Sequence, residues 1–196
     1  MQNIVVFTGA GISAESGLGT FRDSGGLWEE YKIEDVATPA AFERNPELVL
    51  DFYNLRRKQL LESEPNAAHI SLNKLSEKYK LQIITQNIDD LHERSGNKKV
   101  LHLHGKLTEA KSSIDDKIYP INGAELGMGD LCKQGGQLRP NVVWFGEAVP
   151  KMIDAISITK KADVFIVIGT SLNVYPAASL LNYTNNANRI ILIDPK

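Results

Sequence analysis

The sequence predicts an α/β protein: a Rossmann-like parallel sheet with helices on both faces, plus a small inserted lobe. Four short apolar runs, at residues 4–7, 81–85, 164–168 and 190–193, are rich in Val and Ile, and three lead directly into polar or glycine turns. Buried parallel strands have this composition. Helical patterns separate the runs, and strands that alternate with helices indicate a parallel sheet covered on both faces.

The helical patterns and one further extended segment complete the sheet. Helical patterns cover residues 46–63 and 66–79, ahead of the second strand. Residues 100–104 alternate apolar and polar side chains, which is typical of an extended segment. A third helical pattern, at residues 177–184, separates the last two strands.

Two segments interrupt the alternation of strands and helices. The first carries helix signals but no strand where a second Rossmann strand would stand, and the second is rich in glycine with no long periodic element. We interpret both as insertions that form a smaller lobe over the sheet, with a cleft between the lobe and the sheet. The expected division is a Rossmann-like domain of residues 1–21, 66–104 and 141–196, a helical insertion at 22–65 and a small lobe at 105–140.

The composition is that of an ordinary globular chain of 196 residues, 42% hydrophobic and 23% charged. Its formal net charge of −2 provides no field that would gather nucleic acid or an anionic membrane. The single cysteine, Cys132, excludes an intramolecular disulfide and a cysteine-based metal site. No apolar run approaches the roughly 20 residues of a membrane helix, and the start does not resemble a signal peptide, so we expect a soluble cytoplasmic protein.

The first strand ends in a glycine turn, Thr8-Gly9-Ala10-Gly11-Ile12-Ser13-Ala14. This G-x-G-x-x-A pattern opens a helix at the place where a dinucleotide pyrophosphate rests on backbone N–H groups, and glycines let the backbone approach the phosphates. The pattern also occurs in plain strand–helix turns, so alone it leaves both interpretations open. A simple dehydrogenase is disfavoured, because residues 21–30, where an acidic residue should close a second strand, are rich in glycine and contain no strand.

Five further motifs follow the glycine turn in order along the chain. They are Glu15-Ser16-Gly17-Leu18-Gly19-Thr20-Phe21-Arg22-Asp23, Thr85-Gln86-Asn87-Ile88-Asp89, Leu103-His104-Gly105, Val142-Val143-Trp144-Phe145-Gly146-Glu147 and Gly169-Thr170-Ser171. Together they resemble the sirtuin family of NAD-dependent protein deacylases, closest to its bacterial desuccinylase and deacetylase class. The resemblance implies that NAD is consumed as a co-substrate while acyl groups leave lysine side chains of proteins or peptides, which releases nicotinamide and O-acyl-ADP-ribose.

The resemblance also implies a role for each motif. His104 would be the general base that takes a proton from a ribose hydroxyl, which suits an imidazole poised near neutral pH. Asn87 and Asp89 would hold the nicotinamide carboxamide, although this run also has the composition of a helix cap, as do Thr170 and Ser171. The NAD-binding residues implied are Gly9, Ala10, Gly11, Glu15, Thr20, Phe21, Arg22, Gln86, Gly169, Thr170, Ser171 and Asp194, the last standing where the family often has Asn.

Three other histidines need an interpretation. His102 lies two residues before His104, on the same face of an extended segment. A His pair at that spacing can belong to a metal site, but no third ligand stands at a convincing spacing, so no metal is expected there. We interpret His69 and His92 as helix-surface or packing residues.

Tyr53 and Arg56 lie three residues apart on a predicted helix and so share a face. A phenol and a guanidinium together can receive a carboxylate, although the commoner fate of such a pair is a packed Tyr and a solvated Arg. The Tyr-x-x-Arg pattern resembles the signature of sirtuins that remove succinyl and malonyl groups, and Ala37 matches the small residue that widens their pocket. In the family, the acyl-lysine peptide adds as a strand between an apolar edge and a second segment, here Val143, Trp144 and Phe145 opposite Val174.

The sequence departs from the family between the His-Gly and Phe-Gly-Glu motifs. Most sirtuins carry two cysteine pairs for a structural zinc in this interval, but this chain has only Cys132, and Lys111-Ser112-Ser113 stands about where the first pair would be. We therefore expect no zinc, and a small lobe in the place of the zinc module that is held by apolar contacts through Ile114, Ile118, Tyr119, Ile121, Leu126 and Leu131.

The preferred hypothesis is an NAD-dependent deacylase that acts on acetyl and acidic acyl groups through His104. Nicotinamide release without acylated peptide would instead indicate NAD hydrolysis or ADP-ribosyl transfer in the same site. Tight NAD binding without any product would indicate a nucleotide-sensing module. The expected partner is acylated lysine, with neither nucleic acid nor membrane, and the sequence leaves the oligomeric state open.

Overall fold

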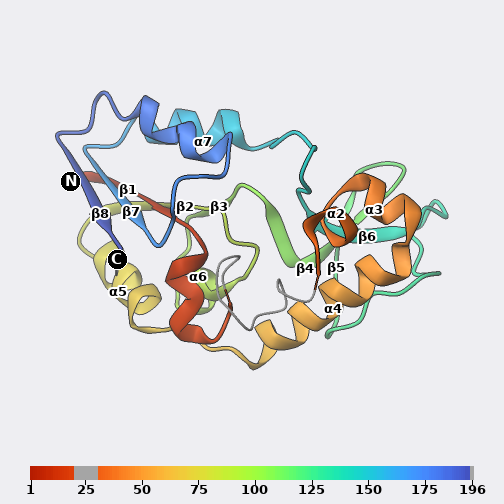
Figure 1. The fold of residues 1–196 in the computed structure, drawn as a ribbon. Helices are drawn as coiled ribbons and strands as arrows, with labels where there is room; N and C mark the ends of the chain where they lie inside the picture. The colour runs from red at the N-terminus through yellow and green to blue at the C-terminus, as the bar shows by residue number, and fades with distance from the viewer. Residues whose placement is uncertain (20–30, 195–196) are drawn as a thin grey trace.

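The computed structural model describes residues 1–19 and 31–194. Its main sheet has five parallel strands in the order β3-β2-β1-β7-β8 (Figure 1). The predicted Rossmann-like sheet is confirmed, and each of the four apolar runs forms a strand within one residue of its predicted bounds. The strands are β1 (Asn3–Thr8), β2 (Lys80–Thr85), β3 (Val100–His102), β7 (Val164–Ile168) and β8 (Arg189–Ile193).

Helices cover both faces of this sheet (Figure 1). On one face Ile4 and Val6 pack with residues of a 3-10 helix and an α-helix, and on the other face Val5 and Phe7 pack with a second such pair. Because side chains alternate along a strand, burial on both faces requires the nearly continuous apolar runs seen in the sequence. The covering helices are η1 (Ala10–Ser16) and α5 (Ala67–Ser76) on the first face, and α7 (Met152–Thr159) and η2 (Ala177–Tyr183) on the second.

A second sheet of three antiparallel strands, in the order β5-β4-β6, lies in the small lobe. It consists of β4 (Gly105–Ser112), β5 (Ile118–Pro120) and β6 (Leu138–Val142). The sequence of this segment shows no long periodic element, yet β4 alone has eight residues. A register shift between Gly105 and Ala110 breaks the pairing, so the buried side chains of β4 do not recur at every second residue.

Three helices of the first insertion lie beside this second sheet (Figure 1). Residues 31–65 contain no strand, as expected. The second and third helices each begin with a proline, after Thr38 and Asn45, whose side chains accept hydrogen bonds from the N–H groups three residues later. The helices are α2 (Ile33–Val36), α3 (Pro39–Arg44) and α4 (Pro46–Glu62).

Contacts between α4 and the second sheet hold the small lobe together. Tyr53 and Leu60 of α4 share a buried cluster with Leu107 of β4 and Val142 of β6. The two insertions therefore form one packed unit, although they lie far apart in the sequence.

The apolar residues expected to hold the small lobe divide into two groups. Leu126 is buried with Leu50 and Ala110, and Tyr119 and Ile121 pack at the margin of that cluster. For the other residues the expectation is wrong, because the lobe buries the side of its sheet that faces α4 and leaves other positions in solvent. More than half of the surface is exposed at Ile114, Ile118 and Leu131.

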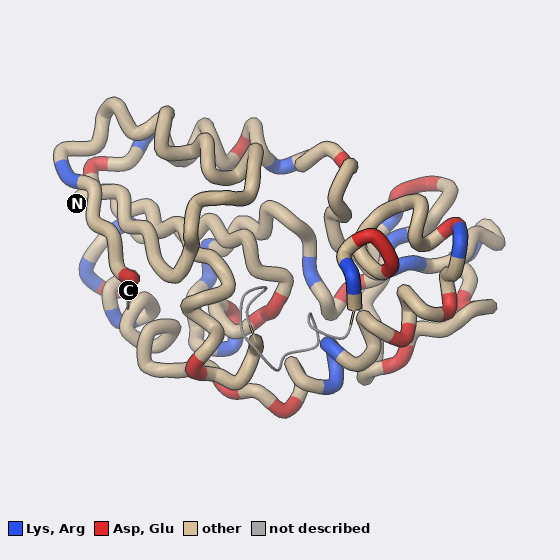
Figure 2. Tube along the Cα trace, in the orientation of Figure 1, with Lys and Arg blue, Asp and Glu red and all other residues tan. Residues whose placement is uncertain are grey.

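Acidic and basic residues are interspersed over both lobes (Figure 2). None of the helices within the described ranges is long and apolar enough to cross a membrane.

Candidate active site

The carboxyl ends of the parallel strands meet at one edge of the main sheet. In open α/β sheets, ligands bind at this edge where the strand order reverses, here between β1 and β7. The Gly9 N–H donates to the Ile168 carbonyl at 3.1 Å, and the Gln86 N–H donates to the Thr8 carbonyl at 2.9 Å. The residues that follow β1 and β2 are therefore bonded directly to the last residues of β7 and β1.

The glycine turn after β1 packs closely against the turn after β7. A Cβ on Gly9 would lie 2.6 Å from Thr170 Cβ, and a Cβ on Gly11 would lie 2.8 Å from Gly169 Cα. Gly169 has a φ of +61°, a left-handed conformation that favours glycine. The Gly11 N–H donates to the Gly169 carbonyl at 2.8 Å. These glycines are thus required for the contact between the two turns, whether or not a phosphate also approaches them.

Ser13, which sequence reasoning did not single out, joins Asn87 to Asp89. Its hydroxyl accepts a hydrogen bond from Asn87 Nδ2 at 3.1 Å and donates one to Asp89 Oδ2 at 3.0 Å. All three side chains are buried. Burial raises the pKa of Asp89, and hydrogen bonds from the Leu91 N–H and the Ser13 hydroxyl oppose this shift. The structure therefore brings the two predicted residues together through a serine of the glycine motif.

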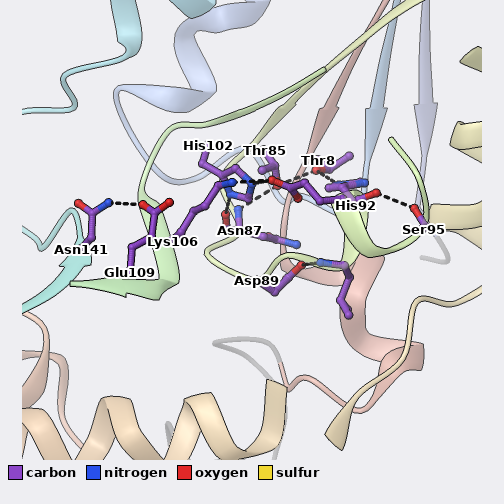
Figure 3. A network of polar contacts seen from close by, with 12 residues as sticks. Thr8, Thr85, Asn87, Asp89, His92, Ser95, His102, Lys106, Glu109 and Asn141 are labelled. Carbon is purple, nitrogen blue, oxygen red and sulfur yellow. Dashed lines mark hydrogen bonds and ion pairs between the residues drawn. The ribbon is translucent and has the colours of Figure 1, made fainter. Parts of the chain in front are cut away.

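His69 and His92 are buried in the same network and do not lie on helix surfaces. The Asn66 N–H donates to His69 Nδ1 at 3.3 Å, which leaves the ring hydrogen on Nε2, 3.5 Å from the Ser13 hydroxyl. The His92 ring centre lies 4.9 Å from that of His69, and His92 Nε2 lies 3.0 Å from Thr8 Oγ1 (Figure 3). Burial lowers the pKa of His69 to about 4 and that of His92 to about 3, so both rings are neutral at neutral pH. Their hydrogen bonds could not be found from the sequence, because they join four separate elements, β1, η1, α5 and the helix that carries His92.

His104 lies half-buried after β3, and its hydrogen bond fixes the ring tautomer. Its Nδ1 lies 3.0 Å from the Gln86 carbonyl oxygen, and since a carbonyl only accepts, Nδ1 carries the hydrogen. Nε2 then holds the lone pair that a general base requires. Burial lowers the pKa of His104, and the bond to Gln86 opposes this shift. His102 Nδ1 lies 2.9 Å from the next carbonyl, that of Asn87, so both rings are bonded to the backbone through Nδ1.

The residues present do not fit the four-cysteine zinc site of the family. The Cys132 Sγ accepts hydrogen bonds from Ser112 Oγ at 3.4 Å and from the Gly136 N–H at 3.3 Å. Ser112 belongs to the run that stands where the first cysteine pair would be. Within residues 1–19 and 31–194, no group of three His, Cys, Asp or Glu side chains could hold a metal ion. A serine–cysteine contact thus occupies this part of the lobe.

Tyr53 is buried on α4 with its hydroxyl in a defined hydrogen bond. Trp144 Nε1 donates to this hydroxyl at 3.0 Å. Burial raises the pKa of Tyr53 to about 12, so the phenol keeps its hydrogen and stays a donor. Arg56, half-buried one turn later, interacts electrostatically with Tyr53 and Asp89; burial lowers the pKa of Arg56, and these two groups oppose the shift. The predicted acyl-binding arginine is therefore within electrostatic reach of Asp89.

The expected apolar edge is formed only in part, because Trp144 is buried and Phe145 is exposed. Side chains alternate along this extended segment, so Phe145 is 45% exposed whereas Trp144 is 3% exposed. The Arg139 guanidinium lies 3.4 Å from the centre of the Trp144 ring and bonds Glu147 at 2.7 and 3.0 Å. Glu147 Oε2 also accepts the Trp144 N–H at 2.7 Å. Arg139 and Glu147 together fix the indole that reaches Tyr53.

The other predicted substrate-binding residues lie around this segment. Ala37 is buried after α2, and its carbonyl accepts the Phe145 N–H at 3.0 Å. The Val143 N–H donates to the His104 carbonyl at 2.9 Å, which ties the segment to the predicted catalytic histidine. Val174 is 37% exposed.

The other predicted NAD-binding residues lie mostly at the surface of the strand-end turns. Gln86 Nε2 donates to Thr170 Oγ1 at 2.9 Å, which links the turns after β2 and β7. The exposed members of this set are Glu15, Ser171 and Asp194, and Ala10 is half-buried. Thr20, Phe21 and Arg22 lie outside the described residues.

Comparison with known proteins agrees with the fold and the motifs. The family model described as the Sir2 family matches residues 9–176. A Bacteroides thetaiotaomicron protein named NAD-dependent protein deacylase is 53% identical over 202 residues, which covers 100% of this chain and 86% of that protein. A Helicobacter pylori protein of the same name is 53% identical over 196 residues, with coverage of 100% and 86%.

Solved structures give the same result. A Sir2 homologue in complex with NAD has a TM-score of 0.90 and 41% identity, covering 99% of this chain and 78% of that one. A Sir2 structure with a p53 peptide and NAD+ has a TM-score of 0.81 and 36% identity, covering 96% and 80%. Fold and site define a Rossmann-like protein with polar residues gathered at its strand ends. The chain belongs to the Sir2 family.

Proposed function

We propose that this protein is an NAD-dependent protein-lysine deacylase that releases nicotinamide and O-acyl-ADP-ribose. The observation that carries the proposal is the convergence of Asn87, Ser13 and Asp89 in one hydrogen-bonded group, with His104 bonded to the carbonyl of Gln86, the residue before Asn87. These side chains supply the polar groups and the base that such a reaction requires. The names of the relatives support the same activity.

The strand-end turns fit a dinucleotide. Gly9, Gly11 and Gly169 leave no side chain over the junction of β1 and β7, and the Gln86 amide and Thr170 hydroxyl border it. We assign this junction to NAD, which a related Sir2 structure holds. When bound, NAD supplies a ribose carbon that becomes electrophilic as nicotinamide leaves.

We assign three tasks to the residues around the nicotinamide end of the site. The Asn87 amide and the Asp89 carboxylate hold the neutral carboxamide, and Ser13 keeps the two side chains at a fixed separation. His104 Nε2 accepts a proton from a ribose hydroxyl, since the Nδ1 hydrogen is already committed to the Gln86 carbonyl.

For the acyl group, we propose that acetyl and the acidic succinyl and malonyl groups are all accepted. A buried carboxylate needs a cation and a donor. Arg56 supplies the cation, and Tyr53, whose raised pKa keeps its hydrogen in place, supplies the donor. The acyl-lysine peptide would lie between Phe145 and Val174, both exposed.

We further propose a cytoplasmic protein that binds neither nucleic acid nor membrane. The net charge of −2 and the mixture of both charge signs over the two lobes (Figure 2) support this proposal.

Mass spectrometry of the products formed from NAD with acetyl-lysine and succinyl-lysine peptides tests the function. We expect deacylated peptide and O-acyl-ADP-ribose in equal amounts. Free ADP-ribose that forms equally fast without peptide would overturn the proposal and indicate NAD hydrolysis. An ADP-ribosylated protein would replace it with ADP-ribosyl transfer.

A further inference from the structure

His102 is buried at the end of β3, with only 3% of its surface exposed, and none of the roles assigned above uses it. Its Nδ1 lies 2.9 Å from the Asn87 carbonyl oxygen (Figure 3). Its Nε2 lies 2.8 Å from Glu93 Oε1, on the short helix α6 (Leu91–Arg94). Both ring nitrogens therefore face oxygen acceptors.

The contact with Asn87 continues the pairing of β2 with β3 beyond the end of the strands. Four successive carbonyls, at residues 85–88, all accept hydrogen bonds. The outer two accept backbone N–H groups at 2.9 and 2.8 Å, and the inner two, of Gln86 and Asn87, accept the rings of His104 and His102. Because the chain turns away at a left-handed glycine directly after His104, side chains replace backbone donors at these two positions.

The partners of His102 indicate that both ring nitrogens carry hydrogen. A carbonyl oxygen only accepts, so Nδ1 is a donor. Glu93 Oε1 also pairs with Lys106 Nζ at 2.8 Å, which requires a carboxylate. Burial alone would raise the pKa of Glu93, but hydrogen bonds and charges from His102 and Lys106 lower it to about 2. Since a carboxylate cannot donate, Nε2 is a donor as well, and the ring is an imidazolium.

The other titratable groups around the ring favour the same state. Asp89 interacts electrostatically with His102, and its carboxylate attracts the imidazolium. His92, on α6 like Glu93, is neutral because burial lowers its pKa to about 3, so it adds no positive charge beside the ring. The positive charge of Lys106 disfavours the imidazolium, but both cations pair with the same Glu93 carboxylate.

We propose that His102 is a positioning residue for Asn87: an imidazolium, anchored by Glu93, that fixes the Asn87 peptide and with it the carboxamide that meets nicotinamide. The Asn87 N–H donates to Thr85 Oγ1 at 3.0 Å, so both backbone polar groups of Asn87 are hydrogen-bonded. This role rests on the proposed function, because contact between Asn87 and nicotinamide is part of it.

Long-range ¹⁵N NMR of the full chain reads the protonation of its four histidines without any turnover. Near neutral pH, we expect His102, assigned by comparison with His102→Gln, to show two protonated ring nitrogens. His104 should show a hydrogen on Nδ1 alone. A neutral ring at His102 would overturn the proposal.

Kinetics test the positioning itself. His102→Leu removes the donor to the Asn87 carbonyl, so we expect kcat for nicotinamide release to fall on the order of 100-fold, with the KM for acylated peptide unchanged. His102→Gln, which keeps one donor, should recover part of this loss. The control is Lys106→Met, which removes the other partner of Glu93 but leaves the bond to Asn87, and it should keep a kcat close to wild type.

The outcomes separate this role from a structural one. An unchanged kcat in His102→Leu would overturn the positioning role. The role would also be overturned if all three variants lost kcat to the same extent and melting temperature to the same extent. An inactive wild-type protein with an imidazolium at His102 would instead overturn the proposed function on which the role rests.

Discussion

The indole N–H of Trp144 donates to the Tyr53 hydroxyl at 3.0 Å, and this bond leaves the phenol hydrogen as the free donor of the proposed acyl pocket. Trp144 is fixed in turn by the guanidinium of Arg139 and the carboxylate of Glu147. The direction of the Tyr53 hydroxyl thus depends on residues about ninety positions away in the chain. A binding group held by packing and hydrogen bonds in this way is preorganised for its ligand.

Arg56→Met should change the choice of acyl group. Without the guanidinium, the succinyl carboxylate has no cation, so kcat/KM for succinyl-lysine should fall by the equivalent of about 2–5 kcal/mol. Acetyl-lysine carries no charge, so its kcat/KM should change little. The measurement is the ratio of the two efficiencies at one NAD concentration, with Arg44→Met, at an exposed arginine, as the matched control.

Tyr53→Phe and Trp144→Phe should shift the same ratio in the same direction, but by less than Arg56→Met. The first removes one neutral donor, worth roughly 0.5–1.5 kcal/mol, and the second frees the hydroxyl that Trp144 holds. Equal losses on both peptides in every variant would contradict the pocket and indicate that these residues only support the fold.

Arg57→Met, one residue further along α4, should lower stability and leave the acyl preference unchanged. Arg57 is 1% exposed, and its guanidinium donates to the carbonyls of Leu107 and Ala124 at 2.8 and 2.7 Å. Each buried carbonyl that loses its partner costs about 1–3 kcal/mol. Chemical denaturation should show this loss, whereas an unchanged midpoint would show that water or another donor replaces the guanidinium.

Stability should fall in mild acid because of the buried neutral histidines. The unfolded chain binds protons at histidine near pH 6.5, whereas burial lowers the pKa of His69 to about 4 and that of His92 to about 3. Between these values the unfolded state binds more protons, so this stability is fully present above pH 6.5 and is lost as pH falls toward 4. Each histidine contributes a slope approaching about 1.4 kcal/mol per pH unit.

The test compares the free energy of unfolding of wild type and His92→Gln between pH 7 and pH 5. The variant should show the shallower dependence, because it lacks one of the two histidines. The difference isolates His92, since Asp89 and Asp90, whose pKa values burial raises, act in the opposite direction in both proteins. Parallel curves would mean that His92 is not held neutral by the fold.

The main sheet could be predicted because burial on both faces leaves a strong signal in the sequence. Residues 164–168 are apolar throughout and form β7 with the predicted bounds. The strand β4 could not be predicted, since its register shift breaks the alternation of buried residues. The sequence of the small lobe therefore shows no long periodic element, although the lobe contains a sheet.

The motifs of the site could be predicted from the sequence, but the hydrogen-bond partners of their side chains could not. Asn87, Asp89 and His104 follow strands, where ligands bind in such sheets, and the structure places all three at that edge. The roles of Ser13 and His69 depend on how η1 packs against α5, which neither segment specifies alone. Sequence reasoning therefore missed the network that joins the predicted residues.

The purified protein should contain no stoichiometric zinc, because one cysteine cannot supply a four-ligand site. Chelator should leave the melting temperature and the activity unchanged. Elemental analysis that finds one zinc ion per chain would contradict this expectation and would require ligands outside the described residues.

The central claim, deacylation that consumes NAD through His104, is tested most directly by measuring nicotinamide and deacylated peptide together in wild type and His104→Ala. Wild type should form the two products in equal amounts. Because burial lowers the pKa of His104, the acid limb of kcat/KM should lie below the usual histidine value of 6.5. His104→Ala should still bind NAD but lose turnover by about 10²–10⁴-fold. A folded, NAD-binding His104→Ala protein that keeps wild-type turnover, or a wild type that forms nicotinamide without deacylated peptide, would contradict the account.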